Sequence, residues 1–216
     1  MTVRRLLIAV VVVLVTACAE SSPRDVAPSQ TPSARATTAP SATDFAAEAA
    51  LGPWRPRPLP APRGFADRVD LNCRAAEPAI GDRTRVVVDL RGQNRLILIF
   101  ADSTAAFACY AAADATLASE VTASPLEVPA EPIGETELDV LRYEVVQDDG
   151  EAAYTVLIGR VGLLAYRVLA GFADESEVEG TKGGSWYAMW WPGPTEFIGV
   201  AAVNQRQEVI GDAPVP

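Results

Sequence analysis

The sequence predicts an α+β domain in which one main helix covers a face of an antiparallel sheet. Short runs rich in Val, Ile, Leu and aromatic residues recur between turn residues through most of residues 65–216, which is typical of antiparallel strands. One Ala-rich stretch, residues 102–119, instead favours a helix. Residues 21–64 are rich in Pro, Ser, Thr and Ala, so we expect a disordered tether there.

The first residues of the chain are typical of a short export leader. Arg4 and Arg5 form a positive segment, and residues 6–15 form an unbroken apolar run that is shorter than the roughly 20 residues of a membrane-spanning helix. Residues 15–18, Val-Thr-Ala-Cys, place a small residue before a cysteine and an aliphatic residue three positions before it. In this order of charge, apolar run and motif the chain resembles the lipobox lipoproteins of bacteria. The resemblance implies cleavage before Cys18 and attachment of lipid to Cys18.

This resemblance divides the chain into three parts. They are a signal peptide at 1–17, the lipidated Cys18 with a Ser/Thr/Pro-rich tether at 18–64, and a globular α+β domain at 65–216. Two or more acyl chains hold a protein stably on a bilayer, so we expect the chain at the extracytoplasmic face of the cell membrane. Two alternatives are export without lipid, which leaves Cys18 a plain thiol, and an uncleaved membrane span.

Composition excludes several classes of function. The chain of 216 residues contains no histidine, which removes the Ser-His-Asp and Cys-His nucleophile systems and the common zinc sites. Its formal net charge is −10, and an acidic chain does not attract nucleic acid through bulk electrostatics. We therefore expect no nucleic-acid partner, and we predict no catalytic residue, cofactor or metal.

The chain has three cysteines. If Cys18 carries lipid, Cys73 and Cys109 remain as a pair in an oxidising compartment, where a disulfide is the usual state. We therefore predict a Cys73–Cys109 disulfide.

The first half of the domain should contain a lead-in, a hairpin and the main helix. Residues 65–80 favour a short helix that carries Cys73. Residues 83–90 and 95–100 predict two strands joined by a turn at 91–94, and the second is apolar on both faces, so it should be covered on each side. Asp102 or Ser103 would then cap a helix that extends to about residue 119.

The second half predicts a series of strands. The expected strands are residues 137–147, 152–158, 163–170, 185–191, 197–203 and 207–210. We expect 152–158 and 163–170 to form neighbouring strands of a meander, with Gly159 and Gly162 in the tight turn between them. The last two strands should form a closing hairpin.

The main candidate for a ligand site is the aromatic segment at 186–191. In a strand, Trp186 and Trp190 share one face, and Tyr187 and Trp191 share the other. Exposed rings beside Glu196 would suit stacking on a sugar ring or on a Pro-rich peptide. The alternative is that these side chains build the core, because tryptophan buries a large apolar area.

Two segments, Ile-Gly-Arg-Val-Gly at 158–162 and Trp-Trp-Pro-Gly at 190–193, are similar to pieces of uncharacterised actinobacterial secreted and lipid-anchored proteins. That similarity implies a location in the cell envelope. We predict a non-catalytic module that is anchored to the membrane through Cys18 and binds an envelope protein or glycan.

Two other functions stay open. A carboxylate-dependent enzyme would need two buried Asp or Glu side chains that face each other in a cleft. A structural accessory subunit of an envelope assembly would show a large exposed apolar patch and no pocket.

Overall fold

A computed structural model of the chain describes residues 52–113, 119–147, 153–195 and 197–214. These residues form one α-helix, one 3-10 turn and twelve strands in three antiparallel sheets of four strands each. The helix α2 spans Arg63–Ala76 and the 3-10 turn η1 spans Pro78–Ile80. Sheet A has the order β1 (Thr84–Leu90), β2 (Arg95–Ala101), β3 (Ala106–Ala113), β4 (Ser119–Leu126). Sheet B has the order β5 (Leu138–Val146), β6 (Tyr154–Val161), β10 (Trp186–Pro192), β9 (Thr181–Gly183). Sheet C has the order β12 (Val209–Ala213), β11 (Phe197–Val203), β7 (Arg167–Phe172), β8 (Glu177–Glu179).

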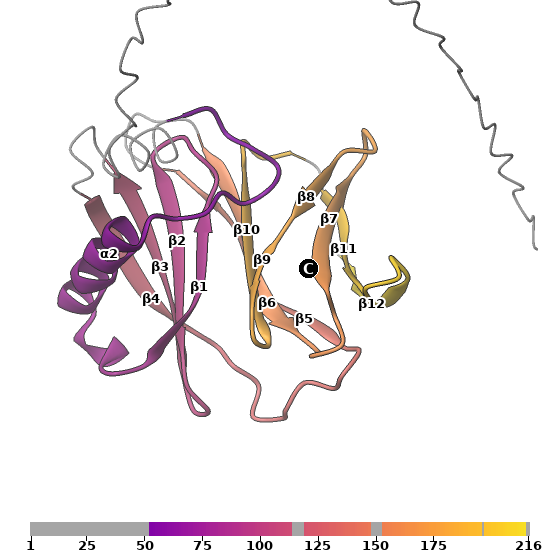
Figure 1. Ribbon diagram of the computed structural model, residues 1–216, viewed down its shortest axis with the longest axis horizontal. Coiled ribbons are helices and arrows are strands. Elements are labelled where there is room, and N and C mark those ends of the chain that lie inside the picture. The colour runs from indigo at the N-terminus through magenta and orange to yellow at the C-terminus, as the bar shows by residue number, and fades with distance from the viewer. Residues whose placement is uncertain (1–51, 114–118, 148–152, 196, 215–216) are drawn as a thin grey trace, which may run out of the picture. The chain divides into compact units, whose positions relative to one another are not determined.

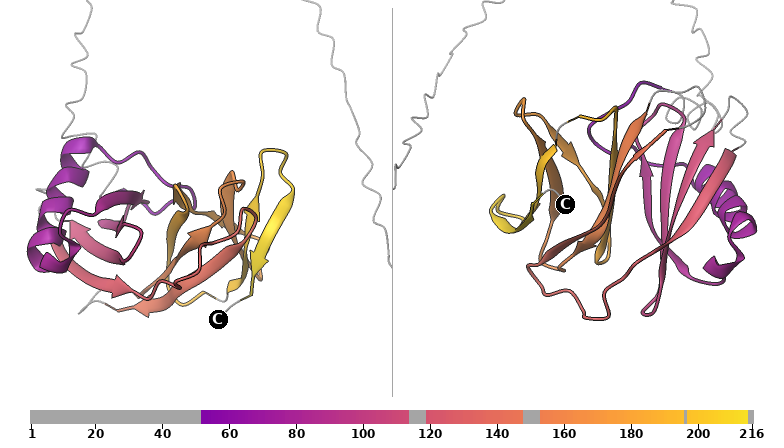
Figure 2. Two further views of the ribbon diagram at one scale, coloured as in Figure 1. Left: turned by 90° about the horizontal axis from the view of Figure 1, so that it is seen from below. Right: turned by 180° about the vertical axis from the view of Figure 1, so that it is seen from behind.

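The helix and the three sheets are stacked in the order α2, sheet A, sheet B, sheet C (Figures 1 and 2). Three apolar cores fill the spaces between successive layers. Phe65, Val69 and Phe100 belong to the first, Ile97, Val156 and Trp190 to the second, and Leu157, Trp191 and Phe197 to the third. Because sheets A and B each have a core on both faces, β2 and β6 are buried along their whole length.

The α+β expectation is confirmed only at its coarsest level, since the described residues combine one α-helix with antiparallel strands and the strands dominate. The single predicted sheet is three sheets. The lead-in helix, the β1–β2 hairpin and the β11–β12 hairpin lie where they were predicted. Gln93 and Asn94 give the first hairpin its turn through left-handed backbone angles, with φ of 51° and 62°.

The predicted helix at 102–119 is wrong. Residues 106–113 form β3, which pairs with β2, and the chain returns from residue 119 as β4. Asp102, the expected helix cap, instead accepts hydrogen bonds from the backbone N–H groups of Thr104 and Ala105 in the turn between β2 and β3. Alanine favours a helix locally, but the buried strand β2 needs backbone partners on both edges, and this pairing overrides the propensity.

The predicted meander of residues 152–158 and 163–170 is also wrong. β6 continues through Val161 in sheet B, and β7 begins at Arg167 in sheet C, so the two strands do not pair. Gly159 lies inside β6 and serves close packing, whereas Gly162 is closely packed and also begins a turn, in which its carbonyl oxygen accepts from the Ala165 N–H at 3.1 Å. A Cβ added at Gly159 would lie 1.9 Å from the Asp139 carbonyl oxygen, and a Cβ added at Gly162 would lie 2.0 Å from the Glu135 carbonyl oxygen.

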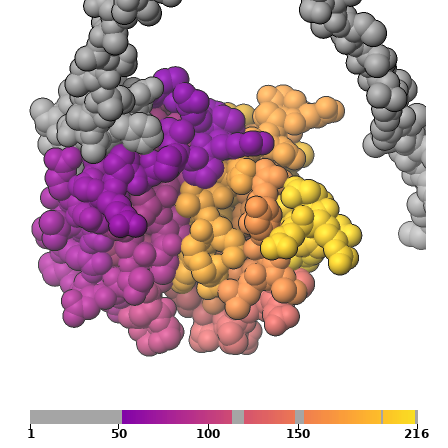
Figure 3. Space-filling view, viewed as in Figure 1, coloured from indigo at the N-terminus to yellow at the C-terminus, as the bar shows by residue number. Residues whose placement is uncertain are grey.

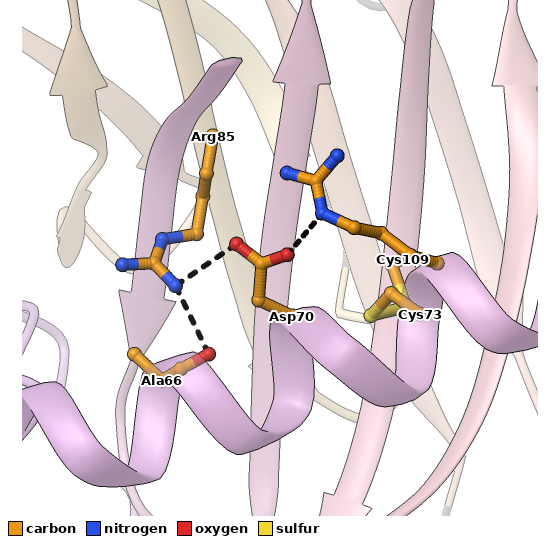
Figure 4. The surroundings of a disulfide bond; sticks show 6 residues. Ala66, Asp70, Cys73, Arg85 and Cys109 are labelled. Carbon is orange, nitrogen blue, oxygen red and sulfur yellow. Dashed lines mark hydrogen bonds and ion pairs between the residues drawn. A yellow bond between two sulfur atoms is a disulfide. The ribbon is translucent and has the colours of Figure 1, made fainter. Parts of the chain in front are cut away.

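Cys73 of α2 and Cys109 of β3 form the predicted disulfide, which joins the helix to sheet A (Figure 4). Both cysteines are fully buried. On the same helix, Asp70 accepts a hydrogen bond from Arg85 of β1 at 3.1 Å, and the same guanidinium nitrogen donates to the Ala66 carbonyl oxygen at 3.1 Å. The disulfide and Arg85 therefore hold α2 on two different strands.

The folded domain begins before residue 65, because residues 53–60, assigned to the tether, pack on the sheets. We call them the N-terminal strap. The Leu59 N–H donates to the Leu90 carbonyl oxygen at 2.7 Å. The indole N–H of Trp54 donates to the backbone carbonyl oxygen of Trp190 at 3.2 Å. Trp54 also packs against the cores on both faces of sheet B. Figure 3 shows the strap, in indigo, crossing from the helix side to sheet C.

No helix in the described part of the chain has both the length and the apolar character that a membrane crossing requires. Cys18 and the predicted signal peptide lie outside the described residues.

Candidate functional site

The aromatic segment at 186–191 is β10, an inner strand of sheet B. Trp186 and Trp190 face sheet A, whereas Tyr187 and Trp191 face sheet C, as the alternation predicted. Their exposed fractions are 8%, 0%, 0% and 2% in chain order, because each face is covered by another sheet. No ring of this segment has a face free for stacking on a sugar or a peptide. These side chains instead form part of the apolar cores on the two faces of sheet B. Glu196 lies outside the described residues.

A different site lies where sheets A and B separate. At one edge of the two sheets, β1 and β9 approach so closely that a Cβ on Gly183 would lie 1.7 Å from the Val86 carbonyl oxygen. At the other edge a cleft of about 720 Å³ opens between β3 and β4 of sheet A and β5 and β6 of sheet B. It is lined by Arg95, Tyr110, Ala111, Ala112, Glu120, Val121, Thr122, Ser124, Glu144, Val145, Val146, Gln147 and Tyr154.

A connected polar cluster bridges this cleft. The Tyr110 hydroxyl of β3 donates to Glu144 Oε1 of β5 at 2.6 Å. Arg142 of β5 donates to the Tyr110 hydroxyl at 3.1 Å and to Ser124 Oγ of β4 at 2.7 Å. A second nitrogen of Arg142 donates to the Pro125 carbonyl oxygen at 2.7 Å. Each side chain is held by at least one neighbour, so the cluster is arranged before any ligand arrives.

Burial raises the pKa of Tyr110 well above its usual value, and the neighbouring carboxylate of Glu144 adds to the rise, although Arg142 opposes it. Tyr110 therefore keeps its proton at any physiological pH. It acts as a neutral donor between a guanidinium and a carboxylate, and the cluster offers both donors and acceptors.

Arg95 and Tyr154 close one end of the cleft. The Arg95 guanidinium carbon lies 3.8 Å from the centre of the Tyr154 ring, a cation–π contact between the first residues of β2 and β6. Both side chains are almost fully buried. This stack gives the cleft a rigid aromatic and cationic end wall.

Two carboxylates line the cleft. Glu120 and Glu144 both line it, but Glu120 is exposed and Glu144 is already engaged by Tyr110. The buried, facing carboxylate pair that an enzyme of this kind needs is therefore not formed by these two residues. Among the described residues, no group of three or more Asp, Glu, Cys or His side chains could hold a metal ion.

Sequence reasoning missed this cleft because it placed β3 in a helix and left β4 outside any element. A signal was present in residues 120–125, where Glu120, Thr122 and Ser124 alternate with apolar residues at the period of a strand. The structure turns these three side chains toward sheet B, and Val121 and Ala123 pack toward α2.

Compared with protein-family models, with curated protein sequences and with solved structures, the chain has no match in any of the three.

Proposed function

We propose that the protein is a lipid-anchored, extracytoplasmic binding module whose cleft between sheets A and B takes an envelope glycan. The carrying observation is the cluster of Tyr110, Glu144, Arg142 and Ser124, which is connected by hydrogen bonds of 2.6–3.1 Å.

The chemistry of the cleft fits a ligand rich in hydroxyl groups. A sugar hydroxyl both donates and accepts, so it pairs well with a site that offers a carboxylate, a guanidinium and neutral hydroxyls side by side. One apolar residue of the cleft wall, Val146, packs with the core between sheets A and B and can cover the C–H face of a sugar ring. A protein segment that fills the cleft is the alternative ligand.

The anchoring half of the proposal is supported by the leader sequence. The lipobox-like residues 15–18 would leave lipid on Cys18, and the Ser/Thr/Pro-rich residues that follow would let the domain reach away from the bilayer. A binding module at the envelope then meets its glycan within the reach of the tether.

The test is titration of the detergent-solubilised full chain with neutral, N-acetylated and uronic-acid oligosaccharides by isothermal calorimetry. We expect one class to bind, and Tyr110→Phe to weaken it about fivefold, because one hydrogen bond of ~1 kcal/mol is lost. Arg142→Gln should weaken it further. Tyr166→Phe is the matched control, because Tyr166 is exposed and does not line the cleft.

Failure of all three oligosaccharide classes to bind would refute the glycan proposal, as would binding that Tyr110→Phe and Arg142→Gln leave unchanged. Chromatography of the titrated oligosaccharides separates binding from catalysis. Shortened products that disappear in Glu144→Gln would establish the enzyme alternative instead.

A structural accessory role is the second candidate. It is favoured by exposed apolar side chains on sheet C and in the turn between β6 and β7. Leu163, Ile198 and Val209 have exposed fractions of 72%, 62% and 63%. Ile198 and Val209 line the same hollow on sheet C, and soluble monomers seldom leave several large apolar groups uncovered in one region.

A further inference from the structure

The outer face of sheet C carries an apolar surface that no described element covers. In the stack of layers, α2 covers the outer face of sheet A, whereas the described residues place nothing over the corresponding face of sheet C (Figures 1 and 2). On this face Leu169 is partly exposed, and Ile198 and Val209 are exposed. Sheets B and C lie between this face and the cleft, so the face is a separate surface.

This face is hollowed into a groove of about 700 Å³, which we call the sheet C groove. Part of its floor lacks large side chains, because Gly171 of β7 and Gly199 of β11 stand directly opposite each other, and beside them Ala201 pairs with the larger Leu169. Four strands spaced about 4.8 Å apart span roughly 14 Å, and a helix with its side chains is about 10–12 Å wide. One helix therefore fits within the width of the sheet.

The charges around the groove are mainly acidic. Glu177 of β8 and Asp212 of β12 line its two sides and are exposed. Arg167, a cation of the lining, is already bound by Glu179 at 2.7 Å and by Gln207 at 3.1 Å. The acidic turn at 174–175 lies beside Glu177 in the chain. An apolar floor between carboxylates is complementary to a partner with apolar side chains flanked by cations.

The net charge of the chain disfavours two other occupants. A second copy would bring another −10 of formal charge to the same acidic rim, and an anionic lipid surface would be repelled in the same way. Neither repulsion applies to a cationic segment of a partner protein.

We propose that the sheet C groove docks a cationic amphipathic helix of a partner protein. The apolar side of this helix lies on Gly171, Gly199 and Ala201, against Ile198 and Val209. Its Lys or Arg side chains meet Glu177 and Asp212. The stack of three sheets would then carry a helix on each outer face. The helix α2 covers sheet A, and the partner's helix would cover sheet C.

The test uses a labelled 18-residue helical peptide with Leu and Ala on one side and Lys on its flanks, titrated into the full chain by fluorescence anisotropy. One matched peptide replaces every Lys by Glu, and another distributes the same residues around the helix. We expect binding of the first peptide only, and weaker binding at high salt.

Ile198→Lys should weaken binding of the peptide at least about tenfold, because it removes apolar contact and adds repulsion. Glu177→Lys should weaken it by a smaller factor. Leu71→Lys is the matched control, since Leu71 is an exposed apolar residue of α2 with an exposed fraction of 68%, and it should leave binding unchanged. Tyr110→Phe should also have no effect, so failure here is distinguishable from failure of the glycan proposal.

Equal binding of the Glu peptide or of the redistributed peptide would overturn the proposal, as would an Ile198→Lys variant that binds normally. If the bound peptide protected only the amides of the edge strand β12 from exchange, it would be adding a strand to sheet C and not docking on its face. Two further outcomes identify other occupants and also overturn it. One is a dimer in sedimentation that Ile198→Lys abolishes, and the other is binding to anionic vesicles that the same variant abolishes.

Discussion

Among single residues, Asp89 and Arg91 hold together parts of the molecule that are far apart in sequence. They form an ion pair of 2.9 Å, and both side chains are fully buried. Arg91 also donates to the carbonyl oxygens of Pro56, in the N-terminal strap, and Glu179, in β8, while Asp89 accepts from Thr181 at 2.6 Å. The pair thus joins the strap to all three sheets.

Asp89→Asn removes the charge and nearly keeps the shape, which leaves the Arg91 guanidinium buried without its counter-ion. We expect the free energy of unfolding to fall by about 3–5 kcal/mol, as measured by urea denaturation. Asp212→Asn, an exposed position, should change it by less than about 0.5 kcal/mol. A small loss at Asp89, similar to that at Asp212, would show that Arg91 does not depend on this carboxylate.

Asp102 makes a prediction about pH. Hydrogen bonds from the backbone N–H and the hydroxyl of Thr104, and then from the Ala105 N–H, lower the pKa of Asp102 from its ordinary 3.8 to about 2. Because the lowered pKa belongs to the folded state, its contribution to stability is complete above about pH 4 and is lost as the pH falls toward 2. Carboxyl ¹³C chemical shifts followed against pH should show this titration. A midpoint near 3.8 would contradict it, and Asp102→Asn should flatten the loss of stability in this window.

Among elements, the disulfide between α2 and β3 secures the outermost layer. Removing it with Cys73→Ala/Cys109→Ala frees a loop defined by a sequence separation of 36. The chain-entropy model then predicts a loss of about 3–4 kcal/mol in the free energy of unfolding. Urea denaturation of the variant measures the loss, and non-reducing peptide mapping of the unaltered chain should show Cys73 linked to Cys109. Two free thiols, or a variant as stable as the parent, would contradict the prediction.

Two layers of the molecule have unlike exposed faces, and the difference suggests a division of labour. The helix α2 covers the outer face of sheet A. No described element covers the sheet C groove on the outer face of sheet C. The cleft between sheets A and B and the groove on sheet C are separated by buried layers. The glycan and the partner helix that we propose would therefore occupy separate surfaces.

For the whole molecule, the main prediction concerns attachment. Cys18→Ser should release the protein from the membrane fraction, because acyl chains on that residue are the proposed anchor. Fractionation followed by immunoblotting measures the release. Intact and N-terminal peptide masses of the unaltered protein should show a chain that starts at Cys18 and carries acyl mass. A chain that starts at Met1, or unchanged membrane retention of Cys18→Ser, would refute the anchor.

Features that depend on neighbours along the chain could be predicted from the sequence. Alternating or continuous apolar runs located β1, β2, β5, β10 and the closing hairpin, and the number of cysteines indicated the Cys73–Cys109 pair. Tertiary structure alone decided which strands share a sheet. The Ala-rich segment is β3 because the edges of β2 require partners, and the four aromatics of β10 are core because a sheet covers each face. The cleft followed from the same long-range pairing, since Tyr110, Ser124 and Glu144 meet only when β3, β4 and β5 are brought together. Local patterns carry the period of a strand but not the identity of its distant partner.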